Sequence, residues 1–170
     1  MTSSHAPTHP AQPDTTFRLA SYAVCRHDDE ILLVSVADPG DGNTIWTLPG
    51  GGVEPLEDPF ETVTREVAEE TGVASRVVRL LGVDSRVIPQ HEAMRGVPHH
   101  NVGIFYEVAV HPGELRDEPS EDTAAPTWVP CSEVAALPRS GLVDIGITLF
   151  AERPASGHVP SVGVEGLVRH

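Results

Sequence analysis

The stretch that decides the fold is GGVEPLEDPFETVTREVAEETGV, at residues 51–73. Its middle part carries the start and stop signals of a helix. Asp58 can cap the N-terminus, Pro59 suits the first helical position, and Gly72 suits the stop after the last turn. These signals predict a helix over about residues 59–71.

One face of this predicted helix carries three carboxylates beside an apolar stripe. At about 100° per residue, Val63 and Val67 fall on the stripe. Glu66, Glu69 and Glu70 gather on the adjoining face. Like charges at these spacings repel by roughly a few tenths of a kcal/mol per pair, and a bound divalent cation would reverse that sign. Because magnesium and manganese prefer carboxylate oxygens, the cluster predicts a site for one of them. The same composition is also ordinary for a solvated helix surface.

Spacing over the longer stretch separates these two interpretations. Gly51 is followed after five residues by Glu57, and after seven more by REVAEETGV, at residues 65–73. This pattern resembles the Nudix box at every defining position, and chance agreement has a probability on the order of one in a million. The flanking WTLPGGGVE, at residues 46–54, resembles the usual approach to that box. Leu56 departs from the pattern, since a glycine often stands there.

The resemblance implies an α/β fold, a Nudix-type α/β/α sandwich around a mixed β-sheet. We expect this domain to span residues 17–152, between a disordered N-terminal arm at 1–16 and a loosely held C-terminal tail at 153–170. Hydrophobic runs separated by turn residues also predict further elements. These are a hairpin of strands at 17–25 and 31–37, strands at 77–88 and 102–110, and short helices at 132–137 and 142–151.

The resemblance also implies roles for residues of the box. The expected metal ligands are three carboxylates and one backbone carbonyl, from Glu66, Glu69, Glu70 and Gly51. Glu57 and Arg65 are expected to hold the loop and the helix together. The expected catalytic residues are Glu69, Glu66 and Arg65, with the planar guanidinium of Arg65 orienting a carboxylate.

The general base that takes a proton from water has two candidate sources. The box offers Glu69 or Glu66. A later loop offers Glu118, Glu121 and Asp122. We expect the box to supply the base, because helical spacing puts ligand and base close together without relying on a loop.

Three residues outside the box are candidate substrate contacts. Trp46 and Tyr106 can stack on a nucleobase, although each lies in a predicted strand, where core packing is the ordinary explanation. Arg86 can grip a phosphate or ribose, although it also fits a plain surface arginine.

The composition limits the partners. The formal net charge is −14 at pH 7, which repels nucleic acid and anionic membranes. No apolar run is long enough to span a membrane, and the N-terminus lacks the pattern of a secretory signal. Cys25 and Cys131 are expected to be ordinary thiols. We therefore expect a cytoplasmic protein, a monomer or homodimer, with a small nucleotide-like substrate.

The leading hypothesis is a hydrolase dependent on Mg²⁺ (or Mn²⁺) that cleaves a phosphoanhydride bond in a nucleoside diphosphate linked to another moiety. The substrate is either a nucleoside triphosphate, which the glycine triplet favours, or ADP-ribose-like, which Pro89 at sixteen residues past the box favours. The alternatives are a non-catalytic Nudix-like nucleotide-binding sensor module and an acidic interaction domain. The intact box favours the hydrolase.

Overall fold

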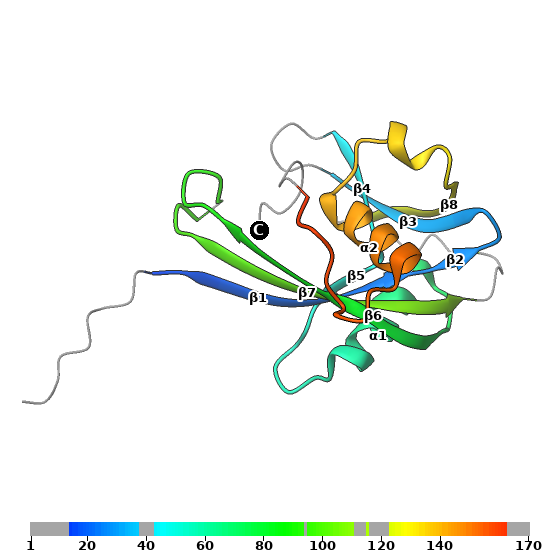
Figure 1. The fold of residues 1–170 in the computed structure, drawn as a ribbon, viewed down its shortest axis with the longest axis horizontal. Helices are drawn as coiled ribbons and strands as arrows, with labels where there is room; N and C mark the ends of the chain where they lie inside the picture. The colour runs from blue at the N-terminus through cyan, green and yellow to red at the C-terminus, as the bar shows by residue number, and fades with distance from the viewer. Residues whose placement is uncertain (1–13, 38–42, 94, 111–114, 116–122, 163–170) are drawn as a thin grey trace, which may run out of the picture.

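The computed structural model describes residues 14–37, 43–93, 95–110, 115 and 123–162 (Figure 1). The strands are β1 Thr16–Val24, β2 Arg26–His27, β3 Glu30–Ala37, β4 Thr44–Thr47, β5 Gly50–Gly52, β6 Ser75–Ile88, β7 His99–Val110 and β8 Thr123–Pro130. The helices are α1 Pro59–Thr71, the short 3-10 helix η1 Val134–Ala136, and α2 Gly141–Glu152.

The strands form two sheets. The first has the order β5-β1-β7-β6, in which β1 is parallel to β7 and the other pairs are antiparallel, so the sheet is mixed. In the second, β3 pairs antiparallel with β2, β4 and β8. The hairpin predicted from strands 17–25 and 31–37 is formed instead by the short strand β2 and by β3. Asp28, with a φ of 50°, lies in its turn. The strand before it, β1, pairs in the other sheet.

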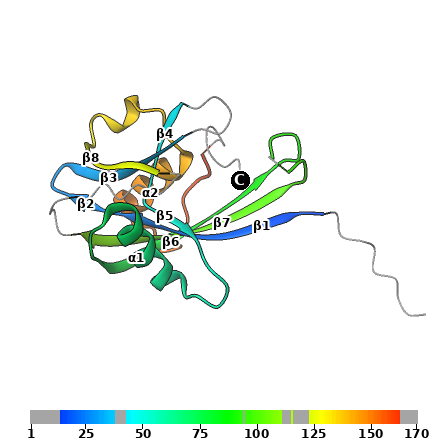
Figure 2. The ribbon, with the colours of Figure 1, turned by 180° about the vertical axis from the view of Figure 1, so that it is seen from behind.

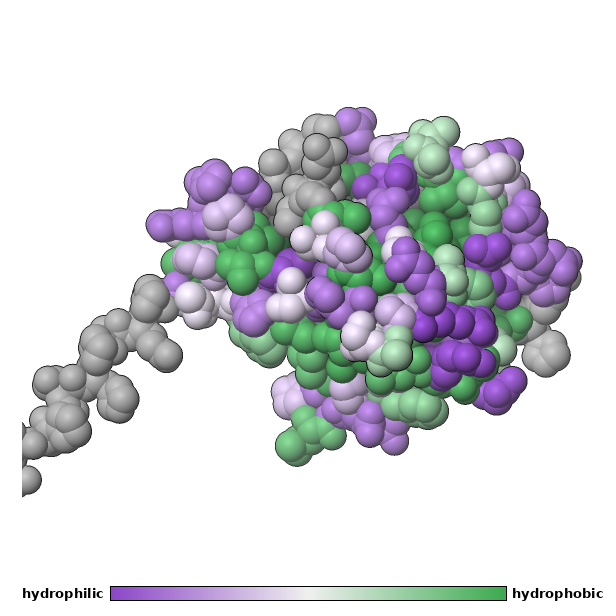
Figure 3. Space-filling model, in the orientation of Figure 1, coloured by the Kyte–Doolittle hydropathy of each residue, from purple (hydrophilic) through white to green (hydrophobic). Residues whose placement is uncertain are grey.

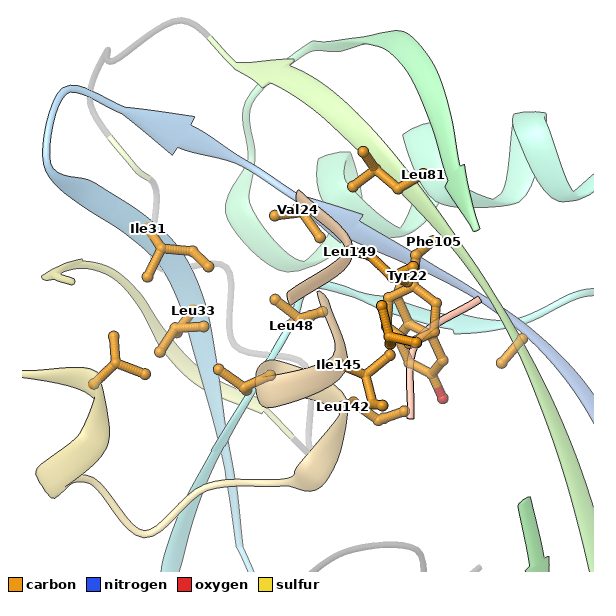
Figure 4. Packing of buried hydrophobic residues seen from close by; sticks show 14 of the residues in the cluster. Tyr22, Val24, Ile31, Leu33, Leu48, Leu81, Phe105, Leu142, Ile145 and Leu149 are labelled. Atoms are coloured by element: carbon orange, nitrogen blue, oxygen red, sulfur yellow. The ribbon is translucent and has the colours of Figure 1, made fainter. Parts of the chain in front are cut away.

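The two helices cover opposite faces of the first sheet, because successive side chains of β1 point to opposite sides. Tyr22 and Val24 belong to a core cluster with Ile145 and Leu149 of α2, and Figure 4 shows this packing from close by. Ala23 and Cys25 belong to a second cluster, which includes Val63 and Val67 of α1. The predicted α/β fold with a mixed sheet between helices is confirmed.

Helix α1 forms where its sequence signals place it. The Asp58 carboxylate accepts a hydrogen bond from the backbone N–H of Phe60 at 2.8 Å. At the other end Gly72 adopts a φ of 68°, and its N–H donates to the carbonyl of Ala68 at 2.9 Å. This left-handed conformation favours glycine, so the helix ends at Thr71.

The later elements differ in their limits from the predicted ones. His99 and His100 already belong to β7, and the first short helix is only the three-residue η1. The part of the C-terminal tail that is described is packed against the domain. The Val159 side chain is buried, and the carbonyl of Gly157 accepts a hydrogen bond from the N–H of Val83. Cys25 and Cys131 are free thiols.

On the face seen in Figure 3, hydrophilic and hydrophobic side chains are intermixed. At one end the strands β1, β6 and β7 extend past both helices (Figure 2). In the described part of the chain, neither helix has the length and apolar character that crossing a membrane requires.

Leu56 is the residue of the loop before α1 whose backbone is under strain. It has a φ of 71°, and its side chain is fully exposed. A β-carbon in this region costs roughly 1–2 kcal/mol, whereas glycine adopts it freely. We expect Leu56→Gly to raise the free energy of unfolding by about 0.5–1 kcal/mol in urea denaturation. Leu56→Ala, which keeps the β-carbon, is the control, and an equal gain from both variants would contradict strain as the cause.

Candidate active site

The last turns of α1 bring two of the predicted carboxylates against the glycine loop of β5. The Glu70 carboxylate accepts a hydrogen bond from the backbone N–H of Gly50 at 2.9 Å. The Glu66 carboxylate lies so close to Gly51 that a β-carbon at this position would overlap it. A side chain at position 51 would therefore displace the Glu66 carboxylate from the loop.

Arg65 connects this loop to the helix. Its Nε and Nη2 atoms donate to the two oxygens of Glu57 at 2.8 and 3.0 Å. Its Nη1 donates to Glu66 at 2.9 Å and to Glu69 at 3.0 Å. The hydrogen bonds from Arg65, together with one from the backbone N–H of Glu54, lower the pKa of Glu57 to about 2. One guanidinium thus sets the positions of three carboxylates.

Burial and mutual repulsion disfavour the charged form of the inner carboxylates. Burial raises the pKa of Glu70 to about 8; the hydrogen bond from Gly50 opposes this rise, and the charges of Glu66 and Glu69 add to it. Burial also raises the pKa of Glu66, although Arg65 opposes the rise. The site therefore holds acidic groups whose charged forms are only partly compensated within the protein.

The residues fit a hard divalent cation by the nature of their donors. Mg²⁺ needs only one or two carboxylates, because it keeps several waters and takes substrate oxygens. The described residues contain no group of three or more His, Cys, Asp or Glu side chains that could hold a metal ion alone. Arg65 holds both Glu66 and Glu69, and the Glu69 side chain is the more exposed of the two, at 58% against 16%. Glu66 and Glu70 are the two carboxylates that lie against the glycine loop.

Of the three candidate substrate contacts, Tyr106 lies with the second core cluster, whereas Trp46 and Arg86 both lie near the start of α2. Trp46 and Tyr106 are half-buried and pack against the first and the second core cluster, respectively. The ring of Tyr106 meets that of Phe60 edge-on, with 6.0 Å between centroids. Arg86 is not a surface arginine, because its side chain is only 4% exposed and forms an ion pair with Asp84. The loop candidates for the base, Glu118, Glu121 and Asp122, lie outside the described residues.

Sequence reasoning missed the polar residues that surround Arg86. Arg18, Tyr22, Asp84, His99 and Asn101 lie on β1, β6 and β7, and all but Arg18 are buried. Asp84 and Arg86 share one face of β6 with Ile88. Alternation alone would instead bury Val83 and Val87, which are exposed, so no clear sequence signal marked these residues.

With this geometry in place, comparison with known proteins assigns the family. The NUDIX domain family model matches residues 16–145, and the chain belongs to this family. The predicted family resemblance is therefore confirmed.

The matched relatives and solved structures are of three kinds. Diphosphoinositol polyphosphate phosphohydrolase 2 of Rattus norvegicus is 50% identical over 56 residues, which cover 33% of this chain and 30% of that protein. The chain thus spans less than a third of that relative's length. The crystal structure of a MutT NUDIX hydrolase from Burkholderia pseudomallei is 30% identical, with a TM-score of 0.54, and the match covers 68% of this chain and 84% of that one. A NUDIX hydrolase from Nitrosomonas europaea shares the fold at 23% identity, with a TM-score of 0.61 over 79% of this chain and 88% of that chain.

Glu70 predicts how the stability of the metal-free protein depends on pH. Its folded pKa of about 8 exceeds the ordinary 4.5. The folded state therefore binds this proton more tightly than the unfolded state does. The contribution of Glu70 to stability is present below about pH 4.5 and is lost as the pH rises to about 8. In excess EDTA, we expect Glu70→Gln to gain stability over the wild type across this window, by up to a few kcal/mol at about 1.4 kcal/mol per pKa unit.

The measurement is urea denaturation of both proteins at several pH values. The matched control is Glu61→Gln, which changes an exposed glutamate on the first turn of α1. Its free energy of unfolding should change with pH in parallel with that of the wild type. If the curve of Glu70→Gln also stays parallel to the wild type, the buried carboxyl does not titrate as described.

Proposed function

We propose that this chain is a hydrolase dependent on Mg²⁺ (or Mn²⁺) that cleaves a phosphoanhydride bond in a nucleoside diphosphate linked to another moiety. The observation that carries the proposal is the crowding of Glu66 and Glu70 against the glycine loop, with burial raising the pKa of both. Carboxyl groups with shifted pKa values gather at functional sites, which favours a site that acts on a ligand over an acidic interaction surface. We also propose a cytoplasmic monomer or homodimer that binds neither nucleic acid nor membrane.

The residues divide the work as follows. A bound divalent cation supplies neutralisation of the phosphate oxygens and activation of a water. Glu66 and Glu70 are proposed to hold this cation at the loop. Arg65 acts as a positioning residue, since its contacts join Glu57, Glu66 and Glu69 and leave its guanidinium engaged with the protein.

Glu69 is the proposed general base. Its side chain is 58% exposed, whereas that of Glu66 is 16% exposed. A base has to meet a water molecule, so the more exposed carboxylate suits this role better. The hydrogen bond from Arg65 Nη1 fixes its orientation.

A second substrate class is favoured by one comparison. The matched relative from Rattus norvegicus is named for action on diphosphoinositol polyphosphates, which carry a diphosphate on a polyphosphorylated alcohol. Both classes contain a diphosphate linked to another group. A panel of nucleoside triphosphates, ADP-ribose-like compounds and diphosphoinositol polyphosphates, with release of phosphate or monophosphate as the readout, separates them.

The first test concerns the cation. We expect hydrolysis to require Mg²⁺ or Mn²⁺, to stop in excess EDTA and to return on re-addition. Glu69→Gln and Glu70→Gln should each lower kcat by roughly 10²-fold or more. The melting temperature should hold or rise, because repulsion between like charges is relieved. Glu61→Gln is the control with unchanged kcat, and full turnover in EDTA would refute the proposed site.

The second test concerns the base. If Glu69 takes the proton, neutralising Glu118, Glu121 and Asp122 together should cost less than about tenfold in kcat, because none of them moves the proton. If the later loop supplies the base, one of these single changes should cost roughly 10²-fold to 10⁴-fold. The measurement is kcat at saturating substrate together with Mg²⁺ affinity. A loop variant with a loss above about a hundredfold and normal metal affinity would move the base away from Glu69.

A further inference from the structure

A second group of charged side chains lies on the α2 side of the first sheet. Arg18 of β1 and Arg86 of β6 both stand in register with Asn101 of the strand between them. His99 lies two residues before Asn101, on the same face of β7. We call Arg18, Arg86, His99 and Asn101 the arginine cluster.

The arginine cluster contains buried polar atoms without a partner among the described residues. They are Arg18 Nε, Arg86 Nη2, His99 Nε2 and Asn101 Oδ1. The side chain of Arg86 is 4% exposed, and Asn101 is 1% exposed. Buried polar groups are normally satisfied by the protein, by water or by a ligand. Four such atoms on three neighbouring strands indicate a place built for a polar occupant.

The charge of the cluster indicates the sign of that occupant. Asp84 is the carboxylate that pairs with Arg86, at 2.6 Å, and no described carboxylate forms an ion pair with Arg18. Besides burial, the charges of Arg18, Arg95 and His100 lower the pKa of His99, which shows that the surroundings are positive. In a chain with a net charge of −14 this local excess stands out. A neutral occupant would leave the charge of the half-buried Arg18 without a partner, which is unfavourable.

The N-terminus of α2 adds to the positive field. A β-carbon on Gly141, the first residue of this helix, would lie 2.9 Å from Arg86 Nη1. The guanidinium therefore lies at the positive end of the helix dipole, where an anion is stabilised and a cation is not. Both the arginines and the helix thus favour a negative group at this place.

The arginine cluster adjoins the carboxylates of the candidate active site. A β-carbon on Gly52 would lie 3.8 Å from the guanidinium of Arg18, and the neighbouring Gly51 touches Glu66. Tyr22 belongs to the surroundings of the arginine cluster, since Asn101 forms a side-chain hydrogen bond with its hydroxyl. Burial raises the pKa of Tyr22. In Figure 4 this hydroxyl points away from the aliphatic side chains of the core cluster.

We propose that Arg18, Arg86 and Asn101 form a binding site for a phosphoryl group of the substrate that the cation does not hold. Planar guanidinium groups match the oxygens of a phosphoryl group better than any other side chain does. The inference rests on the proposed function for its substrate. It adds that the substrate carries an anionic phosphoryl group on the α2 side of the sheet, next to the diphosphate that is cleaved.

Binding of inorganic phosphate in excess EDTA tests this site apart from the cation. Chemical shifts of backbone amides in β1 and β7 are followed while phosphate is added to the full chain. We expect saturable phosphate binding by the wild type and at least tenfold weaker binding by Arg18→Gln. The phosphate affinity of Arg18→Lys should lie between those of the wild type and Arg18→Gln. The double variant Asp84→Asn with Arg86→Gln removes the buried pair without leaving one charge alone, and should weaken binding likewise. Arg79→Gln, an exposed arginine of β6 that pairs with Glu107, is the matched control.

The proposed site would be wrong if the wild type did not bind phosphate, or if Arg18→Gln and Arg79→Gln bound it equally well. It would also be wrong if the protein bound adenosine instead of phosphate and this binding depended on Arg18. With hydrolysis as a second readout, Arg18→Gln should raise KM at least tenfold and change kcat less than KM. Phosphate binding without Mg²⁺-dependent hydrolysis would refute the proposed function and leave the anion site standing, and the reverse result would refute the anion site alone.

Discussion

The candidate active site depends on one guanidinium, that of Arg65. Its fork binds both oxygens of Glu57 in the loop, and its remaining nitrogen contacts Glu66 and Glu69 on the helix. Without it, a loop that lacks regular structure would have to hold its place against a helix end crowded with negative charge. Because a single rigid group makes all these contacts, the carboxylates keep fixed relative positions. The geometry of the site therefore depends on contacts within the protein.

Negative and positive charges are separated across the first sheet. Burial and repulsion raise the pKa of Glu70 on the α1 side. Arg18 and the ion pair of Arg86 with Asp84 lie on the α2 side, and each arginine has a buried nitrogen atom without a partner among the described residues. Each group is unfavourable by itself, because buried charge is costly when it lacks a partner. A bound cation would stabilise the first group, and a bound phosphoryl group would stabilise the second. A substrate whose phosphates reach both would relieve both costs in one binding step.

The sequence predicts the parts of this arrangement that depend on local spacing. The limits of α1 follow from Asp58 and Gly72, and the carboxylate face follows from the helical period, since both are properties of a continuous segment. The pairing of β1 with β7 joins residues about eighty positions apart, so it depends on packing that no local pattern encodes. The burial of Arg86 could not be predicted from the sequence for a related reason. Charged side chains in strands are mostly exposed, and only the third dimension shows that Asp84 and α2 enclose this one.

Leu56 shows that the loop tolerates strain where the carboxylates need precision. A left-handed leucine at this position destabilises the loop, yet the contacts of Glu57 with Arg65 and with the N–H of Glu54 hold the chain in place one residue later. Strained residues persist only where their surroundings over-determine the backbone. The persistence of this one is thus a measure of how firmly the Arg65 contacts fix the loop. Arg65 also contacts the glycine loop of β5 indirectly, because Glu66 touches both Arg65 and Gly51.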